Sequence, residues 1–175
     1  MLSILDFRER EDMNLSKRMS SIAQLKAVIA RKSKKPDNDR TPYIIKSQLV
    51  SEDSEEDMMF NIILSSDYLV RRYLKAGGRQ VMASDYTYGL SVDRIMAMQL
   101  GHVNSIGMFC PVGLMLSNKE TSDSMKYGLR WIKQENVGQI AAMMGDASLA
   151  LSKALNDVLP EPETFNLMCY FHMIR

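Results

Sequence analysis

Residues 139–160 (QIAAMMGDASLALSKALNDVLP) constrain the fold of this chain more than any other stretch. Residues 140–144 form an apolar run of strand length, and a helical pattern follows at once and ends at Pro160. Asp146 therefore lies between a predicted buried strand and a predicted amphipathic helix. Open α/β sheets place their functional residues at such strand ends. On this stretch alone, a helix N-cap is the better explanation of Asp146, because Asp favours that position.

The length and composition are those of one globular domain, with or without an arm. The chain has 175 residues, of which 46% are hydrophobic and 25% charged, so it can bury a core. A net charge of +1 gives no global basic field, although a local patch can still bind nucleic acid. Two cysteines make no disulfide framework, which favours a reducing compartment. We expect no membrane association, because the sequence shows neither a transmembrane segment nor a signal peptide.

Residues 1–57 are predicted to form an N-terminal arm or linker with helical and charged segments. Its two charged runs are RKSKK at 31–35 and SEDSEED at 51–57. The basic run is more consistent with solvated surface, and phosphate contact is the alternative. The acidic run is not a predicted metal site, because adjacent carboxylates without a fixed spacing cannot converge on one ion.

Residues 58–175 are predicted to form an α/β domain. Strands are expected at 58–65, 79–88, 94–100, 108–116, 140–144 and 165–174, with a helix at 66–76, a second that opens at 118–122 and a third after Asp146. Residues 102–107 are the expected hairpin turn. From residue 79 onward the order is β-β-β-α-β-α-β, which describes a three-strand meander followed by two helical crossovers.

Pro111 predicts how these strands are arranged in the sheet. Proline cannot donate to a ladder, so its strand is expected at the sheet edge. The strand at 140–144 must then add beside the strand at 79–88, which brings Asp85 and Asp146 onto adjacent strands. Two neighbouring carboxylates repel each other unless a cation bridges them. The topology thus predicts a metal site, whereas Asp85 alone is explained by an exposed edge position.

Five short motifs resemble, in their order and spacing, the Mutator-like-element (MULE) transposase domain. They are DYTY at 85–88, PVG at 111–113, SNKET at 117–121, GDASLALSKALNDVLP at 145–160 and CYFHMIR at 169–175. The resemblance spans residues 60–175. No single motif is specific, and the signal comes from five motifs in the right order and spacing. It implies an RNase H-like mixed sheet, DDE-type metal-dependent DNA cleavage and strand transfer, and a nuclear location.

The resemblance also assigns roles to individual residues. Asp85 and Asp146 match the first two catalytic carboxylates and would ligate Mg²⁺ or Mn²⁺. Cys169 and His172 match the C-x-x-H signature of the family. Two ligands are too few for a zinc site, and by themselves these residues are better explained as a buried thiol and a packed imidazole. DNA is the implied partner, and a homo-oligomer is compatible with the family.

The third carboxylate of the family, a Glu downstream of C-x-x-H, has no match in residues 1–175. Glu161 and Glu163 precede the last strand and do not occupy that position. We therefore expect a transposase fragment, truncated before the third carboxylate and inactive as it stands, because a missing catalytic group costs orders of magnitude in rate.

Two other hypotheses stay open, and with them the question of whether the chain is an enzyme. One is a non-catalytic DNA- or chromatin-binding relic or co-opted protein, supported by RKSKK. The other is a decay product that exposes apolar surface and an unpaired strand around residues 165–174.

Overall fold

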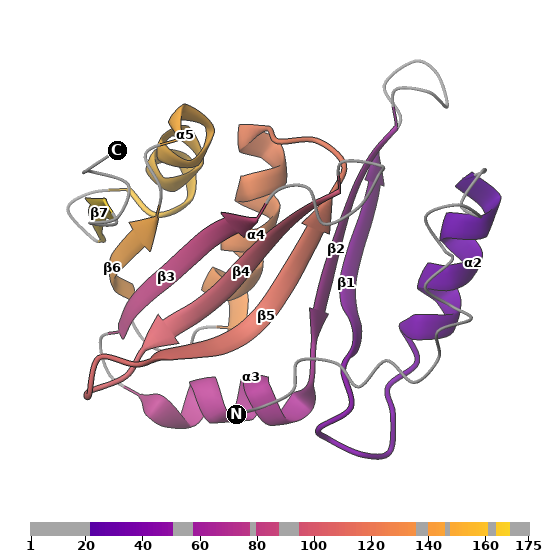
Figure 1. Ribbon diagram of the computed structural model, residues 1–175, viewed down its shortest axis with the longest axis horizontal. Coiled ribbons are helices and arrows are strands. Elements are labelled where there is room, and N and C mark those ends of the chain that lie inside the picture. The colour runs from indigo at the N-terminus through magenta and orange to yellow at the C-terminus, as the bar shows by residue number, and fades with distance from the viewer. Residues whose placement is uncertain are drawn as a thin grey trace.

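The computed structural model describes residues 22–50, 58–77, 80–87, 95–135, 140–145, 148–160 and 164–168. The described elements form an α/β fold with one seven-stranded mixed sheet (Figure 1). In chain order they are α2 (Ile22–Lys32), β1 (Tyr43–Val50), β2 (Met59–Ser65), α3 (Asp67–Ala76), β3 (Gln80–Thr87), β4 (Met96–Val103), β5 (Phe109–Ser117), α4 (Ser122–Glu135), β6 (Ile140–Gly145), α5 (Leu149–Val158) and β7 (Phe165–Met168).

The strand order across the sheet is β1-β2-β5-β4-β3-β6-β7. Neighbours from β1 to β3 pair antiparallel, whereas β6 pairs in parallel with β3 and β7 in parallel with β6. The predicted meander is therefore confirmed as β3, β4 and β5, and α4 and α5 are the two predicted crossovers. The prediction that the 140–144 strand lies beside the 79–88 strand is also confirmed.

The prediction that Pro111 marks a sheet edge is wrong. β5 is an interior strand, with β4 on one side and β2 on the other. Its pairing with β2 starts only at Leu114, so that ladder does not include the proline. Its register with β4 skips Val112, which forms a β-bulge directly after Pro111. The Ser65 hydroxyl donates to the Val112 carbonyl at this bulge. A bulge beyond the end of the β2 ladder is a place where a sheet tolerates proline.

Part of the predicted arm belongs to the sheet. β1 pairs with β2 along its length, and Leu25 of α2 packs in a small cluster with Ile44, Phe60 and Ile62. The sequence did not predict β1, because this strand lies at the sheet edge and its burial follows no regular alternation. The domain boundary at residue 57 stays a prediction.

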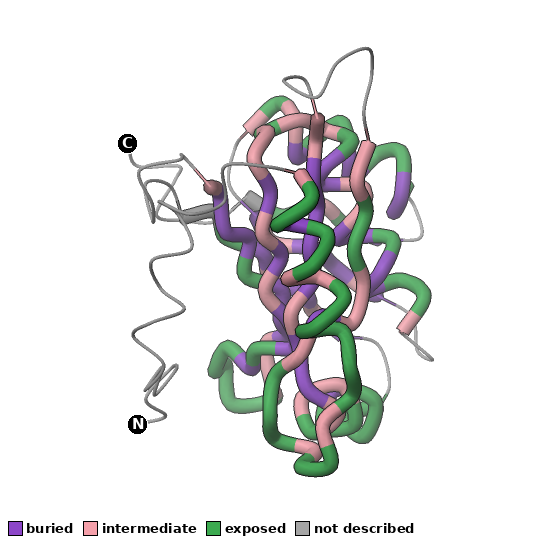
Figure 2. The backbone as a smooth tube through the Cα atoms, turned by 90° about the vertical axis from the view of Figure 1, so that its right-hand side faces the viewer, coloured by how far each residue is buried: buried purple, intermediate pink, exposed green. Residues whose placement is uncertain are grey.

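The larger core lies between the sheet and the helices α3, α4 and α5. Methionine fills much of it, and the residues at most 1% exposed include Met82, Met98, Met115, Met125 and Met143. Ile63 of β2 belongs to this core and its neighbour Ile62 to the α2 cluster, because successive strand residues face opposite sides. Figure 2 shows the buried backbone inside the molecule and exposed turns around it. Within the described ranges, no helix has the length and apolar character needed to cross a bilayer.

Candidate functional site

Asp85 lies near the carboxyl end of β3, and its side chain is exposed. Met82 and Ser84 are buried, so strand alternation directs Asp85 to the face of the sheet opposite the large core. Its partner across the antiparallel β4 ladder is Gln99, which is also exposed. β3 is an interior strand, so the alternative explanation of Asp85 as an edge residue is wrong.

The β3–β6 register brings the two predicted carboxylate positions to the same level of the sheet. The pairing of these parallel strands ends at Ala83 and Met144, and Asp85 and Asp146 each follow two positions later. Adjacent strands lie about 4.8 Å apart, within reach of a bridging cation. Asp146 lies outside the described residues, so the juxtaposition is established as far as Gly145 and the carboxylate–carboxylate distance stays a prediction.

The N-cap explanation of Asp146 is wrong. Ser148 is the N-cap of α5, and its Oγ accepts a hydrogen bond from the Leu151 amide at 3.1 Å. The helix therefore begins after Asp146, at Leu149. Helix capping, the explanation that the sequence alone favoured, therefore does not account for an Asp at position 146.

Gly145 ends β6 where the chain passes closely over α5. A Cβ at this position would lie 2.4 Å from Cδ2 of Leu151, and Leu151 is fully buried. A larger residue would therefore push α5 away from the end of β6. Glycine is therefore required at position 145 for steric reasons.

Ser84 lies next to this site but on the core face of the sheet, and the sequence did not predict its role. Its side chain is 5% exposed, and its Oγ has no hydrogen-bond partner among the described residues. The same Oγ lies 3.5 Å from where a Gly145 Cβ would stand, so the hydroxyl faces the end of β6. A buried hydroxyl without a partner costs free energy. Only the alternating pattern, which buries residue 84 with Met82, could have indicated it.

The carboxyl ends of β3, β6 and β7 lie at the same end of the sheet, because the three strands are parallel. Gly145 pairs with Met168, and these residues directly precede Asp146 and Cys169 in the chain. Cys169, His172, Glu161 and Glu163 all lie outside the described residues. In the part of the chain that the structure describes, no three His, Cys, Asp or Glu side chains come together as a metal site.

Two lysines of α4 contact the carboxyl end of α5, which lies toward the amino ends of β6 and β7. The Lys126 ammonium lies 2.7 Å from the Asp157 carboxylate and 3.0 Å from that of Asp123. Hydrogen bonds to these carboxylates, first to Asp157, raise the pKa of Lys126. Lys133 donates at 2.8 Å to the carbonyl of Val158, the last residue of α5. The helix that follows β6 is thereby fixed at its carboxyl half.

A second polar cluster lies at the amino end of β3, away from Asp85. The Gln80 amide nitrogen lies 3.4 Å from the carbonyl oxygens of both Tyr73 and Gly77, where α3 ends. Gln80 Oε1 must then accept, so His102 carries its proton on Nδ1, 3.1 Å away. Burial and the nearby charge of Arg72 lower the pKa of His102. This corrects the prediction that placed His102 in the hairpin turn, since it is a buried residue of β4.

No protein-family model matches the chain, and no curated protein sequence matches it.

Proposed function

We propose that residues 58–175 form a partial DDE-type catalytic domain with an RNase H-like fold, similar to MULE transposases. Its first two metal-ligating carboxylates would be Asp85 and Asp146. The observation that carries this proposal is the strand order β5-β4-β3-β6-β7, an antiparallel meander extended by two parallel strands. That is the order expected of an RNase H-like sheet, and it is independent of the motifs that suggested the family.

The chemistry of the described residues fits a divalent cation at this end of the sheet. Asp85 is exposed and forms no ion pair with any described residue, so its oxygens are free to bind a ligand. Hard oxygen donors of this kind suit Mg²⁺ or Mn²⁺. A bound ion would supply Lewis-acid stabilisation of phosphoryl oxygens in DNA.

The side chains around Asp85 would bind and orient the DNA backbone. Gln99 is exposed directly across the ladder from Asp85, and its amide can donate to a phosphate oxygen. Asp85 and Asp146 would hold the ion against that phosphate. No Glu in residues 1–175 matches the third carboxylate, so we expect weak binding of one ion. We also expect cleavage to be orders of magnitude slower than by a complete set of ligands.

A plasmid-nicking assay in Mg²⁺ or Mn²⁺, with EDTA as the blank, tests catalysis. The variants are Asp85→Asn and Asp146→Asn, which keep the side-chain shape but remove the charge. Asp37→Asn, at an exposed loop position, is the matched control. We expect slow metal-dependent nicking by the wild type and the control, and its loss in both site variants. Equal nicking by all four proteins, or by none, would exclude catalysis by this chain.

The second candidate function is DNA binding without catalysis, by a relic or co-opted protein located in the nucleus. Its support is the basic run at 31–35, which lies at the carboxyl end of α2 and is exposed throughout. Binding of this kind is insensitive to EDTA and to Asp85→Asn. Those two controls separate it from a metal-dependent enzyme.

A further inference from the structure

The outward face of α3 carries a stripe of positive charge. Arg71, Arg72 and Lys75 are exposed, whereas Tyr73 is 1% exposed and packs in the large core. At 3.6 residues per turn, these three cations and Tyr68 project within roughly 100° of one another. The helix therefore exposes one face that carries an aromatic ring and three cations.

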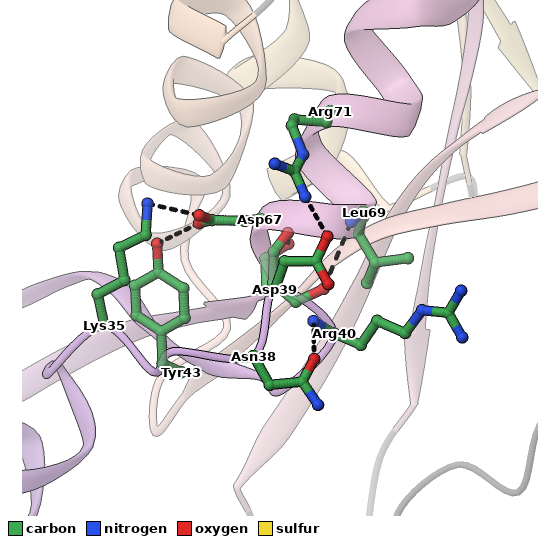
Figure 3. Close-up of polar contacts among 10 residues, drawn as sticks. Lys35, Asn38, Asp39, Arg40, Tyr43, Asp67, Leu69 and Arg71 are labelled. Carbon is green, nitrogen blue, oxygen red and sulfur yellow. Dashed lines mark hydrogen bonds and ion pairs between the residues drawn. The ribbon is translucent and has the colours of Figure 1, made fainter.

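The loop between α2 and β1 adds a further cation and is fixed against this helix (Figure 3). The Arg40 guanidinium lies 5.1 Å from the centre of the Tyr68 ring, in a cation–π contact. Asp39 of the same loop pairs with Arg71, and its carbonyl accepts from the Tyr68 amide at 2.9 Å. These contacts hold Arg40 beside the stripe. We call Arg40, Arg71, Arg72 and Lys75 the α3 basic surface.

Positive charge is concentrated at this surface and is only partly neutralised. Residues 31–40 and 67–76 contain eight Lys and Arg against three Asp, although the whole chain has a net charge of only +1. Arg72 and Lys75 have no carboxylate partner among the described residues. Arg71 and Lys75, four positions apart on one helix face, repel each other and weaken the helix. An external anion would relieve this repulsion.

The α3 basic surface lies at the opposite end of the sheet from Asp85. Gln80, the first residue of β3, contacts the carboxyl end of α3, and Asp85 follows five positions later. At about 3.3 Å per residue, that is roughly 17 Å along the strand. Figure 1 shows α3 across the lower end of the sheet, away from the carboxyl ends of β3 and β6. This surface is therefore separate from the candidate catalytic site.

We propose that the α3 basic surface binds the phosphate backbone of duplex DNA, at a second site distinct from Asp85. The choice of DNA rests on the proposed function. Arg40, Arg72 and Lys75 each neutralise a phosphate and release its condensed counterion, so binding is independent of sequence and steeply salt-dependent. The contact between Arg40 and Tyr68 holds that guanidinium in place before DNA arrives, which reduces the side-chain entropy lost on binding.

Fluorescence anisotropy of a labelled 20-base-pair duplex, titrated with the full chain in EDTA over a series of salt concentrations, tests this proposal. The double variant Arg72→Gln/Lys75→Gln removes two charges from the surface. Its matched control, Arg130→Gln/Lys153→Gln, removes two exposed charges from α4 and α5. We expect the slope of log K against log salt to fall by about 0.9 for each phosphate that the first variant no longer neutralises. The control should keep the wild-type slope.

Three results would overturn the proposal. Equal weakening of duplex binding in both double variants would show attraction by total charge alone. No binding of the duplex by the wild type in about 50 mM salt would exclude the site, because protein–phosphate interactions are strong under those conditions. Binding to vesicles with anionic headgroups but not to the duplex would identify a membrane surface instead.

The same titration with Asp85→Asn separates this proposal from the proposed function. Asp85 lies at the other end of the sheet, so its variant should bind the duplex in EDTA as the wild type does. If the wild type binds the metal but not the duplex, only the α3 basic surface is refuted. Duplex binding without a metal site would refute only the catalytic proposal.

Discussion

At the scale of single residues, Tyr43 and Tyr73 have hydroxyl groups in opposite situations. The Tyr43 hydroxyl donates to the Asp67 carboxylate at 2.8 Å. The Tyr73 hydroxyl is buried and has no hydrogen-bond partner among the described residues. Burial raises the pKa of Tyr73 to about 12, so the group is a neutral phenol at any ordinary pH. The Tyr43 hydroxyl therefore stabilises the folded state, and burial of the unpaired Tyr73 hydroxyl destabilises it.

Tyr43→Phe and Tyr73→Phe should therefore change stability in opposite directions. Loss of the bond to Asp67 should lower the free energy of unfolding by about 0.5–1.5 kcal/mol. Removal of the unpaired Tyr73 hydroxyl should raise it by about 1 kcal/mol, because the desolvation cost disappears while the ring contact with His102 remains. Urea unfolding of both variants measures the difference. A destabilised Tyr73→Phe would mean that the hydroxyl has a partner.

His102 should make stability depend on pH. Burial, with Arg72 nearby, lowers its pKa below the ordinary value of 6.5 in the folded protein. The unfolded chain then binds the proton first as pH falls, so stability is full above pH 6.5 and is lost as pH falls through the folded-state pKa. Urea unfolding between pH 8 and pH 5 should show this decline in the wild type. His102→Leu should show a smaller decline, and an equal one would exclude His102 as its source.

Sequence reasoning could predict some residues of the site but not others. The strand-then-helix pattern placed Asp146 at a strand end, and the family motif gave Asp85. The sequence analysis preferred Asp146 as the cap of α5, because Asp favours N-caps, whereas the cap is Ser148, whose residue type favours them equally. The close approach of Gly145 to Leu151 is tertiary information. Ser84 was missed for a similar reason, since a serine in a strand carries no sign of lacking a partner.

At the scale of elements, Pro111 shows how a sound local rule can give a wrong position. Proline does lack a donor, yet a strand can be interior in one part and unpaired on one side in another. β5 meets this requirement with its bulge at Val112 and with a β2 ladder that ends at Leu114. The position of β6 beside β3 was nevertheless correct, because β2 occupies the other side of β5.

Two glycines that face the core of the sheet should respond differently to alanine. A Cβ on Gly113 would lie 2.8 Å from the ring of Trp131, which is buried and cannot move aside. Gly113→Ala should cost about 1–3 kcal/mol of unfolding free energy. A Cβ on Gly128 would lie 3.1 Å from the flexible Met115 side chain, and alanine gains up to about 1 kcal/mol in helix propensity.

Thermal melts of the two alanine variants measure this contrast. Gly128→Ala should stay close to the wild type, and Gly113→Ala should melt several degrees lower. Similar melting temperatures for both variants would contradict the close packing of α4 on β5.

At the scale of the whole molecule, the order of elements from residue 79 onward followed from local patterns alone. Strand runs, helix periodicity and right-handed crossovers leave few ways to build the second half of the sheet. The first half was harder to predict. β1 is an edge strand with irregular burial, and its role depends on pairing with β2 and on cover from α2. Contacts between separate elements of this kind produce little recognisable pattern in the sequence of either element.

A bound divalent ion at the carboxyl ends of β3 and β6 can be located directly. NMR of the labelled chain during Mn²⁺ titration reports it, because the paramagnetic ion broadens nearby backbone amide signals. We expect selective broadening at Ser84, Asp85, Gln99 and Gly145, and its loss in Asp85→Asn. Broadening centred on another acidic region, or equal broadening in Asp85→Asn, would contradict a metal site at the ends of β3 and β6.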